Sequence, residues 1–554
     1  MTDDLARPAF AADVVAANTA AGYWPGRTVH DMLVDAAGRH PDRTLIVDVA
    51  GRVTYGEALA LSARLAGNLA ALGVGPGDVV AVQLPNWRHF PLLEYALARL
   101  GAVCTPLPHI YRHRELRLML GLVEPKVAIV PATFRGFDHA TMLRDVAAGI
   151  PSLRHLVVAG EAPAGMIAFD DLLGPATPPP AVSRPDHVAE IVFTSGTTGE
   201  PKGVMHTANT NLCPLVGLVA DRRLGPDDVV LMASTFGHQT GFVYGGQLPV
   251  MIGGAVVLME RWNAAEALAL IARERVTFTM GATPFLQDLA GAEDAGIAGG
   301  SLRTFLCSGA PIPRSLLAEA QRRLGCTVAT GWGMTELGLM TVTHRADPPA
   351  AAAESDGRVL PGNEVRLVDD DGRDAAPGEE GNVLGRGPTM FAGYYKRPAI
   401  TAALFDADGW FHTGDRARAA GGGNIRISGR TKDIVIRGGE NIPILEVEDL
   451  LHRHPALAAV AVVAVPDPRF QEKACAAVVL RPGSRFDFAA MRDHLEGLQL
   501  ARQFLPEYLV ELEDFPMTPS GKVQKYLLRA RVVEMLRRRG DLAPATKEET
   551  ADAR

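Results

Sequence analysis

The 554-residue chain contains few cysteines, and the five that it has lie far apart with no C-x-x-C spacing. This pattern supports neither a disulfide framework nor a cysteine-based zinc site, so we expect reduced thiols in a cytoplasmic protein. Basic charge is also in short supply, because 63 acidic residues outnumber 55 lysines and arginines and the formal net charge is −8. A polyanion needs a basic face, so nucleic acid is not an expected partner.

Long apolar runs are missing too. The run "LPVMIGGAVVLM" at 248–259 is among the longest, and it is predicted to form buried strands because it is too short to span a bilayer. The N-terminal stretch "MTDDLARPAF" is acidic and has no apolar segment of the kind that a secretory signal needs. The sequence therefore predicts neither a transmembrane segment nor a signal peptide.

The chain does contain a regular alternation of strand and helix patterns. Strands are predicted at 44–49, 78–85 and 102–107, and amphipathic helices at 54–72 and 90–101. The first helix opens with a capping box, in which Thr54 is followed three residues later by Glu57. The alternation resumes between 229 and 328. Near-continuous apolar strands separated by helices predict an α/β fold with a largely parallel sheet covered on both faces.

The pattern changes twice toward the C-terminus. From about Gly357, short strands divided by Asp-Gly and Pro-Gly turns predict a small β-rich subdomain at about 357–430. A helix at 444–454 and strands at 459–466 and 473–480 then predict a compact α+β unit of ordinary domain size. We therefore expect a large N-terminal domain over 1–430 and a smaller C-terminal domain over 431–554.

The stretch "FTSGTTGEPKGVMHT" at 193–207 concentrates hydroxyl groups and glycines around one lysine, Lys202. Backbone N–H groups of a glycine-rich turn can converge on an anion, while hydroxyls add donors and the lysine adds a positive charge. It is not a Walker A loop, because Gly203 follows the lysine where Ser or Thr is required. By itself the stretch is compatible with a phosphate cradle and with an ordinary solvated turn.

The residue order of "TSGTTGEPKG" (194–203) resembles the phosphate loop of the AMP-forming adenylating enzymes, which include acyl-CoA synthetases, peptide-synthetase adenylation domains and firefly luciferases. Six further stretches resemble motifs of that family in the same order: "TFGHQTGF" (235–242), "CSGAPIP" (307–313), "GWGMTE" (331–336), "WFHTGD" (410–415), "GRTKDIVIRGGENI" (429–442) and "PMTPSGKVQK" (516–525). The resemblance implies a large N-terminal domain of stacked αβ sheets and a mobile C-terminal domain that carries a lysine.

The resemblance also implies a nucleotide site for ATP. Its expected residues are Thr194, Ser195, Gly196, Thr197, Thr198, Gly199, Lys202, Ser308, Gly309, Ala310, Pro311, Gly331, Trp332, Gly333, Met334, Thr335, Asp415, Arg430 and Lys522. Among them, Trp332 offers a face for adenine, Asp415 can accept from the ribose hydroxyls, and Arg430 can meet the sugar or the phosphates. Alternatively, Trp332 is an ordinary core tryptophan, and Asp415 or Arg430 is one half of a structural salt bridge.

Adenylation joins two anions, so positive charge must be supplied before a carboxylate attacks the α-phosphorus of ATP. The resemblance makes Lys522 the cation that bridges the two, where a lone lysine would otherwise be an exposed loop residue. Glu336 is expected to bind Mg²⁺ and Thr335 to donate to the α-phosphate, with helix capping as the alternative. His238 is expected to position the substrate without acid–base chemistry, although a structural histidine would look the same.

Further roles follow from the same resemblance. The acyl pocket is expected to involve His238, Gly241, Gly281, Ala282 and Trp332. Gly438 and Gly439 are expected to line the channel for the thiol of coenzyme A, since small side chains suit a narrow tunnel. Lys432 is expected to be the hinge about which the C-terminal domain rotates between two half-reactions.

The nearest likeness is to short- and medium-chain fatty acyl-CoA synthetases and cyclohexanecarboxylate–CoA ligases. We therefore expect an ATP-dependent ligase that converts a hydrophobic monocarboxylate to its acyl-CoA through an acyl-adenylate, with Mg²⁺ and coenzyme A. Its partners are then small molecules, and a homodimer is compatible with the sequence. Three alternatives stay open: an adenylating enzyme that loads a separate carrier protein, a ligase for aryl or other acids, and a non-catalytic nucleotide-binding protein or scaffold that kept the fold.

Overall fold

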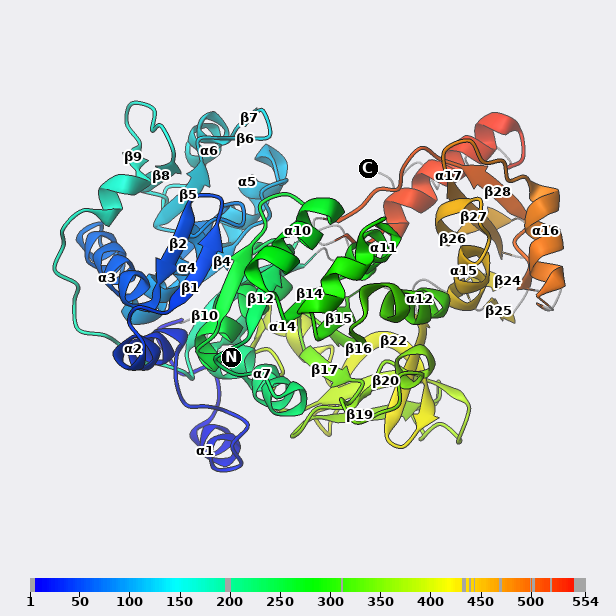
Figure 1. Ribbon diagram of the computed structural model, residues 1–554, viewed down its shortest axis with the longest axis horizontal. Helices are drawn as coiled ribbons and strands as arrows, with labels where there is room; N and C mark the ends of the chain where they lie inside the picture. Colours follow the sequence, from blue (N-terminus) through cyan, green and yellow to red (C-terminus); the bar gives the residue numbers. More distant parts are fainter. Residues whose placement is uncertain are drawn as a thin grey trace.

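The computed structural model describes residues 5–194, 201–309, 312–430, 435–437, 440–442, 444–467, 471–498, 500, 504–518 and 521–542. Two large sheets and one smaller sheet organise these residues (Figure 1). Helices cover the sheets and separate the two large ones, which confirms the predicted α/β class.

The first large sheet has eight strands in the order β21-β11-β10-β4-β3-β5-β8-β9. They span Gly393–Tyr394, Lys202–Thr207, Val188–Thr194, Val103–Pro106, Val79–Val82, Val127–Pro131, His155–Ala159 and Ile167–Ala168, respectively. The central strands β4, β3, β5 and β8 are parallel, and β10 joins them parallel to β4. In β3 alternate residues enter two different hydrophobic cores, so both faces of this sheet are covered, as predicted.

Helices pack against both faces of the first sheet. One core contains α5 (His113–Val123) and α6 (His139–Ala147). The other contains α2 (Val29–Arg39), α3 (Tyr55–Ala71), α4 (His89–Leu100) and α7 (Ala208–Arg222). This second core also includes strands of the other large sheet, so these four helices form a layer between the two sheets.

The second large sheet has thirteen strands in the order β19-β20-β22-β23-β18-β17-β16-β15-β14-β12-β13-β1-β2. They span Glu364–Val368, Glu380–Arg386, Phe411–Gly421, Asn424–Arg430, Arg358–Val359, Gly338–Val342, Thr327–Met334, Thr304–Ser308, Phe278–Gly281, Val229–Met232, Ala255–Leu258, Thr44–Asp48 and Gly51–Thr54. The run from β16 to β1 is parallel, and α10 (Ala264–Glu274), α11 (Thr283–Gly291) and α12 (Arg314–Leu324) cover its outer face.

Most of the predicted β-rich stretch continues this same sheet. Strands β18, β19, β20, β22 and β23 join it through antiparallel pairing of β16 with β17 and of β17 with β18, whereas β21 belongs to the eight-stranded sheet. The hydrophobic core at this end of the sheet includes the aromatic residues Trp332, Phe391, Tyr394 and Phe411. The predicted boundary after 430 falls at residues 431–434, outside the described residues.

The third sheet has the order β25-β24-β27-β26, with β28 beside β27. These strands span Glu440–Ile442, Val435–Arg437, Gln471–Leu480, Leu457–Asp467 and Tyr508–Glu511. Helices α15 (Ile444–His452) and α16 (Phe488–Gly497) cover one face, and α17 (Lys525–Arg539) covers the other. This unit lies at one end of the molecule beside α11 and α12 (Figure 1).

The remaining elements are short or peripheral. They are α1 (Ala12–Ala20), β6 (Thr133–Phe134), β7 (Phe137–Asp138), η1 (Phe169–Leu173), α8 (Gln239–Gly241), η2 (Phe242–Gln247), α9 (Leu248–Ile252), η3 (Ala295–Gly300), α13 (Ala351–Glu354) and α14 (Pro398–Ala402). In the described part of the chain, no helix combines the length and the apolar composition needed to cross a membrane.

Several local predictions can be compared with these elements. Helix α3 begins at Tyr55 with both hydrogen bonds of the Thr54–Glu57 capping box, as predicted. All five cysteines are free, also as predicted. The prediction that 248–259 forms only strand is wrong, because Leu248–Ile252 is a helix and only Ala255–Leu258 is a strand. Pro249 fits the first helical turn, and Gly253, at φ 72°, ends the helix in the left-handed conformation.

Candidate active site

Four neighbouring parallel strands bring predicted site residues to one edge of the thirteen-stranded sheet. Strand β14 ends at Gly281, β15 ends at Ser308, and β16 carries Gly331 opposite Ser308. His238 follows β12, which pairs with β14. Carboxyl ends of parallel strands meet at the same edge, where open α/β sheets bind ligands. Residues from motifs far apart in the sequence are thus gathered at one place.

Trp332, Asp415 and Arg430 form a hydrogen-bonded group beside this edge. The indole Nε1 of Trp332 donates to Asp415 Oδ2 at 2.7 Å, and Nε of Arg430 donates to Oδ1 at 3.0 Å. The carboxylate is buried, whereas 59% of the Arg430 side chain is exposed. Asp415 and Arg430 also face each other across β22 and β23. Each carboxylate oxygen has two acceptor sites, so this group retains capacity for hydroxyl donors of a ligand.

Glu336 is buried, and Tyr394 holds its carboxylate. The hydroxyl of Tyr394 donates to Glu336 Oε1 at 2.7 Å. Burial, followed by the charge and hydrogen bond of Glu336, raises the pKa of Tyr394 above its ordinary value. Nζ of Lys202 lies 5.1 Å from the centroid of the tyrosine ring, within the range of a cation–π contact. Because Lys202 and Tyr394 belong to the eight-stranded sheet, these contacts join the two large sheets at the site.

A single carboxylate is enough for the metal that the sequence predicts. Among the described residues, no group of three His, Cys, Asp or Glu side chains could surround a metal ion. Mg²⁺ usually keeps several waters and binds through one or two carboxylates together with phosphate oxygens. The Glu336 carboxylate accepts one hydrogen bond from Tyr394 and has further acceptor sites, so its chemistry fits this ion.

Lys522 reaches the same place from the C-terminal part of the chain. Two hydrogen bonds hold its backbone: Lys522 N donates to Thr518 Oγ1 at 2.9 Å, and Thr518 N donates to Lys522 O at 2.7 Å. A Cβ added to Gly309 would lie 3.3 Å from Cε of Lys522. Gly309 also has φ +87°, so its lack of a side chain admits both the backbone conformation and the lysine.

The electrostatic surroundings of Lys522 include four of the predicted site residues. Burial and the positive charge of Arg430 lower the pKa of Lys522 to about 8, while Asp415 and Glu336 oppose this shift. Burial and then the charge of Lys522 lower the pKa of His238 to about 3. The structure therefore brings His238, Arg430, Asp415 and Glu336 within electrostatic range of Lys522.

His238 is neutral at ordinary pH, and its hydrogen bonds define its tautomer. The backbone N–H of Thr240 donates to His238 Nδ1 at 3.2 Å, and the Thr240 hydroxyl lies at 3.2 Å from the same atom. A neutral imidazole carries one proton, so that proton is on Nε2. A neutral N–H donor is suited to holding an acid in place, which agrees with the predicted positioning role.

The glycines predicted for the acyl pocket and the nucleotide site have steric reasons in the fold. A Cβ on Gly241 would lie 2.2 Å from the carbonyl oxygen of Thr235, and one on Gly333 would lie 2.1 Å from that of Gly338. Both positions therefore require glycine for close backbone approach. At Gly281 a Cβ would lie 3.2 Å from the Phe285 ring, so this ring occupies part of the space that the glycine leaves.

Ten predicted site residues lie outside the described residues. They are Ser195, Gly196, Thr197, Thr198, Gly199, Ala310, Pro311, Lys432, Gly438 and Gly439. Thr194 and Lys202, which border the predicted phosphate loop, face each other across the antiparallel pair β10 and β11. Met334, the last residue of β16, and Thr335, which follows it, are partly buried beside Glu336.

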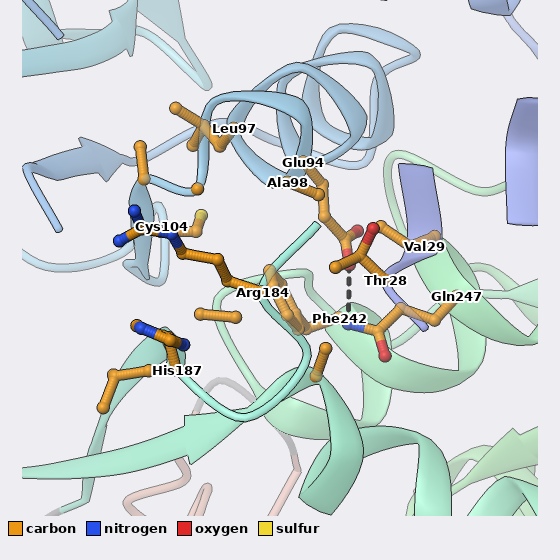
Figure 2. Close-up of a pocket in the computed structure, with 15 residues that line it drawn as sticks. Thr28, Val29, Glu94, Leu97, Ala98, Cys104, Arg184, His187, Phe242 and Gln247 are labelled. Carbon is orange, nitrogen blue, oxygen red and sulfur yellow. Dashed lines mark hydrogen bonds between the residues drawn. The ribbon is translucent and has the colours of Figure 1, made fainter. Parts of the chain in front are cut away.

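A separate cavity lies in the layer between the sheets, and none of the predicted site residues lines it (Figure 2). Glu94 of α4 and Gln247 of η2 meet there, with Gln247 Nε2 donating to Glu94 Oε1 at 2.8 Å. Burial raises the pKa of Glu94 well above its ordinary value, and the charge of Glu190 adds to that effect. The hydrogen bond from Gln247 opposes this rise in pKa, and the net effect of burial is to favour the neutral form of the carboxyl group.

Two polar contacts of the site have no signal in the sequence. Nothing in the motifs indicates that Trp332 donates to Asp415, or that Tyr394 donates to Glu336. These pairs lie 83 and 58 residues apart, and only the tertiary fold brings them together. In each pair, a tryptophan or tyrosine donates a hydrogen bond to a carboxylate that is predicted to bind a ligand. The two partners lie too far apart in the sequence for any local pattern to indicate the contact.

Known proteins match most of this chain. The AMP-binding enzyme family model matches residues 33–395, and the AMP-binding enzyme C-terminal domain model matches residues 446–522. A medium-chain fatty-acid–CoA ligase of Escherichia coli is 35% identical over 93% of this chain and 92% of its own. A salicyl-AMP ligase/salicyl-S-ArCP synthetase of Mycobacterium tuberculosis is 34% identical, with 93% of each chain covered.

Solved structures agree with these relatives. MatB from Rhodopseudomonas palustris with ATP bound superposes with a TM-score of 0.82 at 29% identity, covering 91% of this chain and 99% of MatB. The apo structure of the same protein gives a TM-score of 0.71 at 28% identity, with 92% and 99% of the chains covered. With two family models along the chain and relatives matched nearly end to end, the chain belongs to the AMP-binding enzyme family of AMP-forming adenylating ligases.

Proposed function

We propose that this enzyme is an ATP-dependent acid–CoA ligase that converts a hydrophobic monocarboxylate to its acyl-CoA in the cytoplasm, using Mg²⁺. The observation that supports this most strongly is the position of Lys522. Its amino group lies beside Gly309 and within electrostatic range of Glu336, Asp415 and Arg430. The cation of the C-terminal part of the chain thus lies close to side chains of the N-terminal part that can bind a nucleotide.

In the first half-reaction, an oxygen of the carboxylate attacks the α-phosphorus of ATP. A new C–O–P link forms, the bond between the α-phosphorus and the bridging oxygen breaks, and pyrophosphate leaves with the electron pair. No proton is transferred in this step, so the main requirement is positive charge near two anions. Lys522, with its pKa lowered to about 8, is still mostly protonated at neutral pH and can supply that charge.

The remaining residues would hold the nucleotide. The carboxylate of Asp415 would accept from ribose hydroxyls, and the exposed Arg430 would contact the sugar or a phosphate. Trp332 would present its ring to adenine while its N–H keeps Asp415 in place. Glu336, fixed by Tyr394, would hold Mg²⁺, and this ion neutralises charge on the phosphates of ATP when bound.

The acid would lie between His238 and the wall that follows β14. Nδ1 of His238 accepts a hydrogen bond, so the proton of the neutral ring is on Nε2. This N–H can donate to a carboxylate oxygen of the acid. Next to Gly281, the rings of Phe285 and Trp262 pack edge to face with centroids 4.7 Å apart. An apolar aromatic wall favours a hydrophobic acyl group, which agrees with the E. coli relative named for medium-chain fatty acids.

In the second half-reaction, the thiol of coenzyme A would attack the acyl carbon. The C–S bond forms, AMP leaves with the carboxyl oxygen, and the thiol proton passes to solvent. We place the domain division after residue 430, the hinge at Lys432 and the thiol channel at Gly438 and Gly439. The better superposition on ATP-bound MatB than on its apo form supports the interpretation that the arrangement described here is the adenylating one.

A panel of acids tests the proposal. Acid-dependent release of pyrophosphate is measured with short-, medium- and long-chain linear acids, cyclohexanecarboxylate, benzoate and salicylate, and thioester formation is then followed after addition of coenzyme A. We expect the highest kcat/KM with a medium-chain or alicyclic acid. The proposal is wrong if no acid supports pyrophosphate release, or if coenzyme A never yields a thioester.

A second candidate function is loading of a carrier protein with an aryl acid. It is favoured by the equal similarity to the salicyl-AMP ligase/salicyl-S-ArCP synthetase, which matches 93% of this chain. In the same panel, this function requires preference for salicylate or benzoate and transfer to a pantetheinylated carrier but not to coenzyme A.

Replacement of Lys522 by alanine provides a prediction for the catalytic cation. We expect acid-dependent pyrophosphate release to fall by about 100-fold or more, which is the usual cost of removing one preorganised electrostatic group. Thioester formation from a supplied acyl-adenylate should change much less. Lys525→Ala is the matched control, because Lys525 pairs with Glu448 at 2.7 Å inside the C-terminal part. Equal losses of both half-reactions in Lys522→Ala would contradict the assigned role.

A further inference from the structure

His206 is a completely buried histidine whose two ring nitrogens both have partners. It lies on β11, four residues after Lys202. Nε2 lies 2.7 Å from the backbone carbonyl oxygen of Thr335, and Nδ1 lies 3.0 Å from the hydroxyl oxygen of Thr210. Since a carbonyl can only accept, the proton is on Nε2, and Nδ1 of the neutral ring accepts from the Thr210 hydroxyl.

The partner of His206 belongs to the segment that enters the candidate active site. Thr335 and Glu336 are anchored at three points. His206 Nε2 donates to the carbonyl of Thr335, Phe391 N donates to the carbonyl of Glu336 at 2.8 Å, and the Tyr394 hydroxyl donates to the Glu336 carboxylate. All three donors come from the eight-stranded sheet or from the residues leading into its strand β21.

The imidazole is itself held firmly. Thr210 stands in the first turn of α7, where it exchanges capping hydrogen bonds with Thr207. Burial lowers the pKa of His206 to about 4, although its hydrogen bond to Thr335 opposes this shift, so the ring is neutral at physiological pH. The ring therefore acts as a rigid spacer between α7 and the carbonyl of Thr335.

We propose that His206 is a positioning residue for the ATP–Mg²⁺ site. Acting through the Thr335 carbonyl, it fixes the Thr335–Glu336 segment of the thirteen-stranded sheet relative to the strand that carries Lys202. This inference rests on the proposed function, in which Thr335 and Glu336 contact phosphate and metal. A displacement of about 1 Å in a reacting geometry can cost on the order of 100-fold in rate, so such a spacer affects nucleotide binding and adenylation.

Two substitutions separate positioning from simple packing. His206→Leu removes both hydrogen bonds, whereas His206→Gln offers an amide N–H close to the position of Nε2. With the full-length enzyme and its best acid, we expect His206→Leu to raise KM for ATP and the Mg²⁺ concentration at half-maximal rate by about 10-fold, with KM for the acid unchanged within about twofold. His206→Gln should recover most of this loss.

His30→Leu is the matched control. His30 is also fully buried in a helix of the middle layer, its pKa is also lowered to about 4, and its Nε2 lies 3.3 Å from Arg99 Nη1. Its replacement also removes a buried ring contact, but at a distance from the Thr335 segment. We expect a lower melting temperature for His30→Leu with unchanged KM for ATP.

Nitrogen-15 NMR of histidine-labelled wild-type enzyme tests the geometry directly. His206 should show one protonated and one unprotonated ring nitrogen, Nε2–H and Nδ1, unchanged from pH 5.5 to 8. The inference is overturned if the protonated nitrogen is Nδ1, or if His206→Leu lowers only the melting temperature and leaves the ATP and Mg²⁺ dependences unchanged. Should the wild-type enzyme release no pyrophosphate with any acid, the proposed function fails instead, and the tautomer still tests the contact.

Discussion

A tyrosine hydroxyl holds the carboxylate that is proposed to bind the metal. Tyr394→Phe removes that hydroxyl but keeps the ring beneath Lys202. Because hydrogen bonds to charged groups contribute about 1.5–3 kcal/mol, we expect the Mg²⁺ concentration at half-maximal pyrophosphate release to rise by roughly 10-fold or more. KM for the acid should stay the same. A magnesium titration at saturating ATP and acid measures the effect.

Tyr395 provides the control for that substitution. It is the next residue along the chain, and its side chain packs into the core on the other side, with α5 and α6. Tyr395→Phe should therefore leave the magnesium dependence as it is in the wild type. If Tyr394→Phe behaves like Tyr395→Phe, the hydroxyl does not position the metal-binding carboxylate.

A second prediction at this scale concerns a buried acid. Burial raises the pKa of Glu190 from 4.5 to about 8, and its Oε2 accepts from Asn211 Nδ2 at 2.9 Å. In the unfolded chain this carboxyl ionises near 4.5, so the folded state binds an extra proton between the two values. Stability is therefore lost as pH rises from about 4.5 to about 8. Glu190→Gln lacks this titration.

The measurement is a pair of melting curves for each protein. We expect the melting temperature of Glu190→Gln, relative to that of the wild type, to be higher at pH 8 than at pH 5. Parallel curves, with a constant difference over this range, would mean that Glu190 does not carry an extra proton in the folded state.

Sequence motifs singled out Lys522, Glu336, Asp415 and Arg430 as candidate site residues, because each lies in a short pattern that resembles a known family. The residues that orient these side chains could not be predicted from the sequence. His206 and Thr335 lie 129 residues apart, and their contact depends on how two sheets meet. A buried histidine in a strand carries no local mark that distinguishes a spacer from an ordinary core residue.

At the scale of elements, local chemistry predicted helix starts and ends well. The Thr54–Glu57 capping box forms, and α4 ends at Gly101, whose φ of 65° is the left-handed conformation that favours glycine. The apolar run at 248–259 could not be divided by its periodicity, because a buried strand and a buried helix are equally apolar. Its first half continues the helical path of η2, and only the tertiary fold sets that path.

Helix α12 presents an element-level prediction, because its cap comes from another part of the chain. Its own N-cap residue, Pro313, provides no side-chain hydrogen bond. Instead, Oδ1 of Asp449 in α15 accepts from the backbone N–H of Arg314 at 2.6 Å. A carboxylate at a helix N-terminus satisfies an unpaired N–H group and interacts favourably with the helix dipole. This contact joins α15 to α12 in the arrangement that places Lys522 at the site.

Asp449→Ala should therefore slow adenylation selectively. Loss of an N-terminal cap costs about 0.5–2 kcal/mol, so we expect acid-dependent pyrophosphate release to fall by roughly 2- to 30-fold. The rate of thioester formation from a supplied acyl-adenylate should stay near the wild-type rate. Single-turnover measurements of the two half-reactions give this comparison.

Arg453→Gln serves as the control. Arg453 lies directly after α15 and contacts the other oxygen of Asp449 at 2.9 Å, so its replacement leaves the cap in place. It should have little effect on either half-reaction. If Asp449→Ala slows both half-reactions equally, the substitution damages the C-terminal unit itself. The prediction that it weakens only the docking of α15 on α12 is then wrong.

At the scale of the whole molecule, the sequence predicted the α/β class but not the extent of the sheets. Strand β1, at Thr44–Asp48, pairs with β13, at Ala255–Leu258, far along the chain. The antiparallel strands β18, β19, β20, β22 and β23 extend the same sheet through β17. Strand patterns give the faces of each strand, but they carry no information on which distant strand is its neighbour.

The docked position of the C-terminal unit gives a prediction for the whole molecule. Lys522 has a pKa lowered from 10.5 to about 8 when it lies beside Gly309 and Arg430. If undocking returns this lysine to water, its pKa returns toward 10.5, so docking without ligand releases a proton. The docked arrangement is therefore disfavoured below about pH 8 and gains stability as pH rises from 8 toward 10.5.

Energy transfer between dyes on exposed sites of α10 and α16 measures this equilibrium in the ligand-free enzyme. We expect the docked fraction to increase between pH 7 and pH 9.5, and to be independent of pH in Lys522→Met, which has no charge to remove. ATP with a bound acid should abolish the pH dependence in the wild type, because phosphate charges stabilise the protonated lysine. A wild-type docked fraction that falls with rising pH would mean that the lysine docks in its charged form through partners other than those seen here.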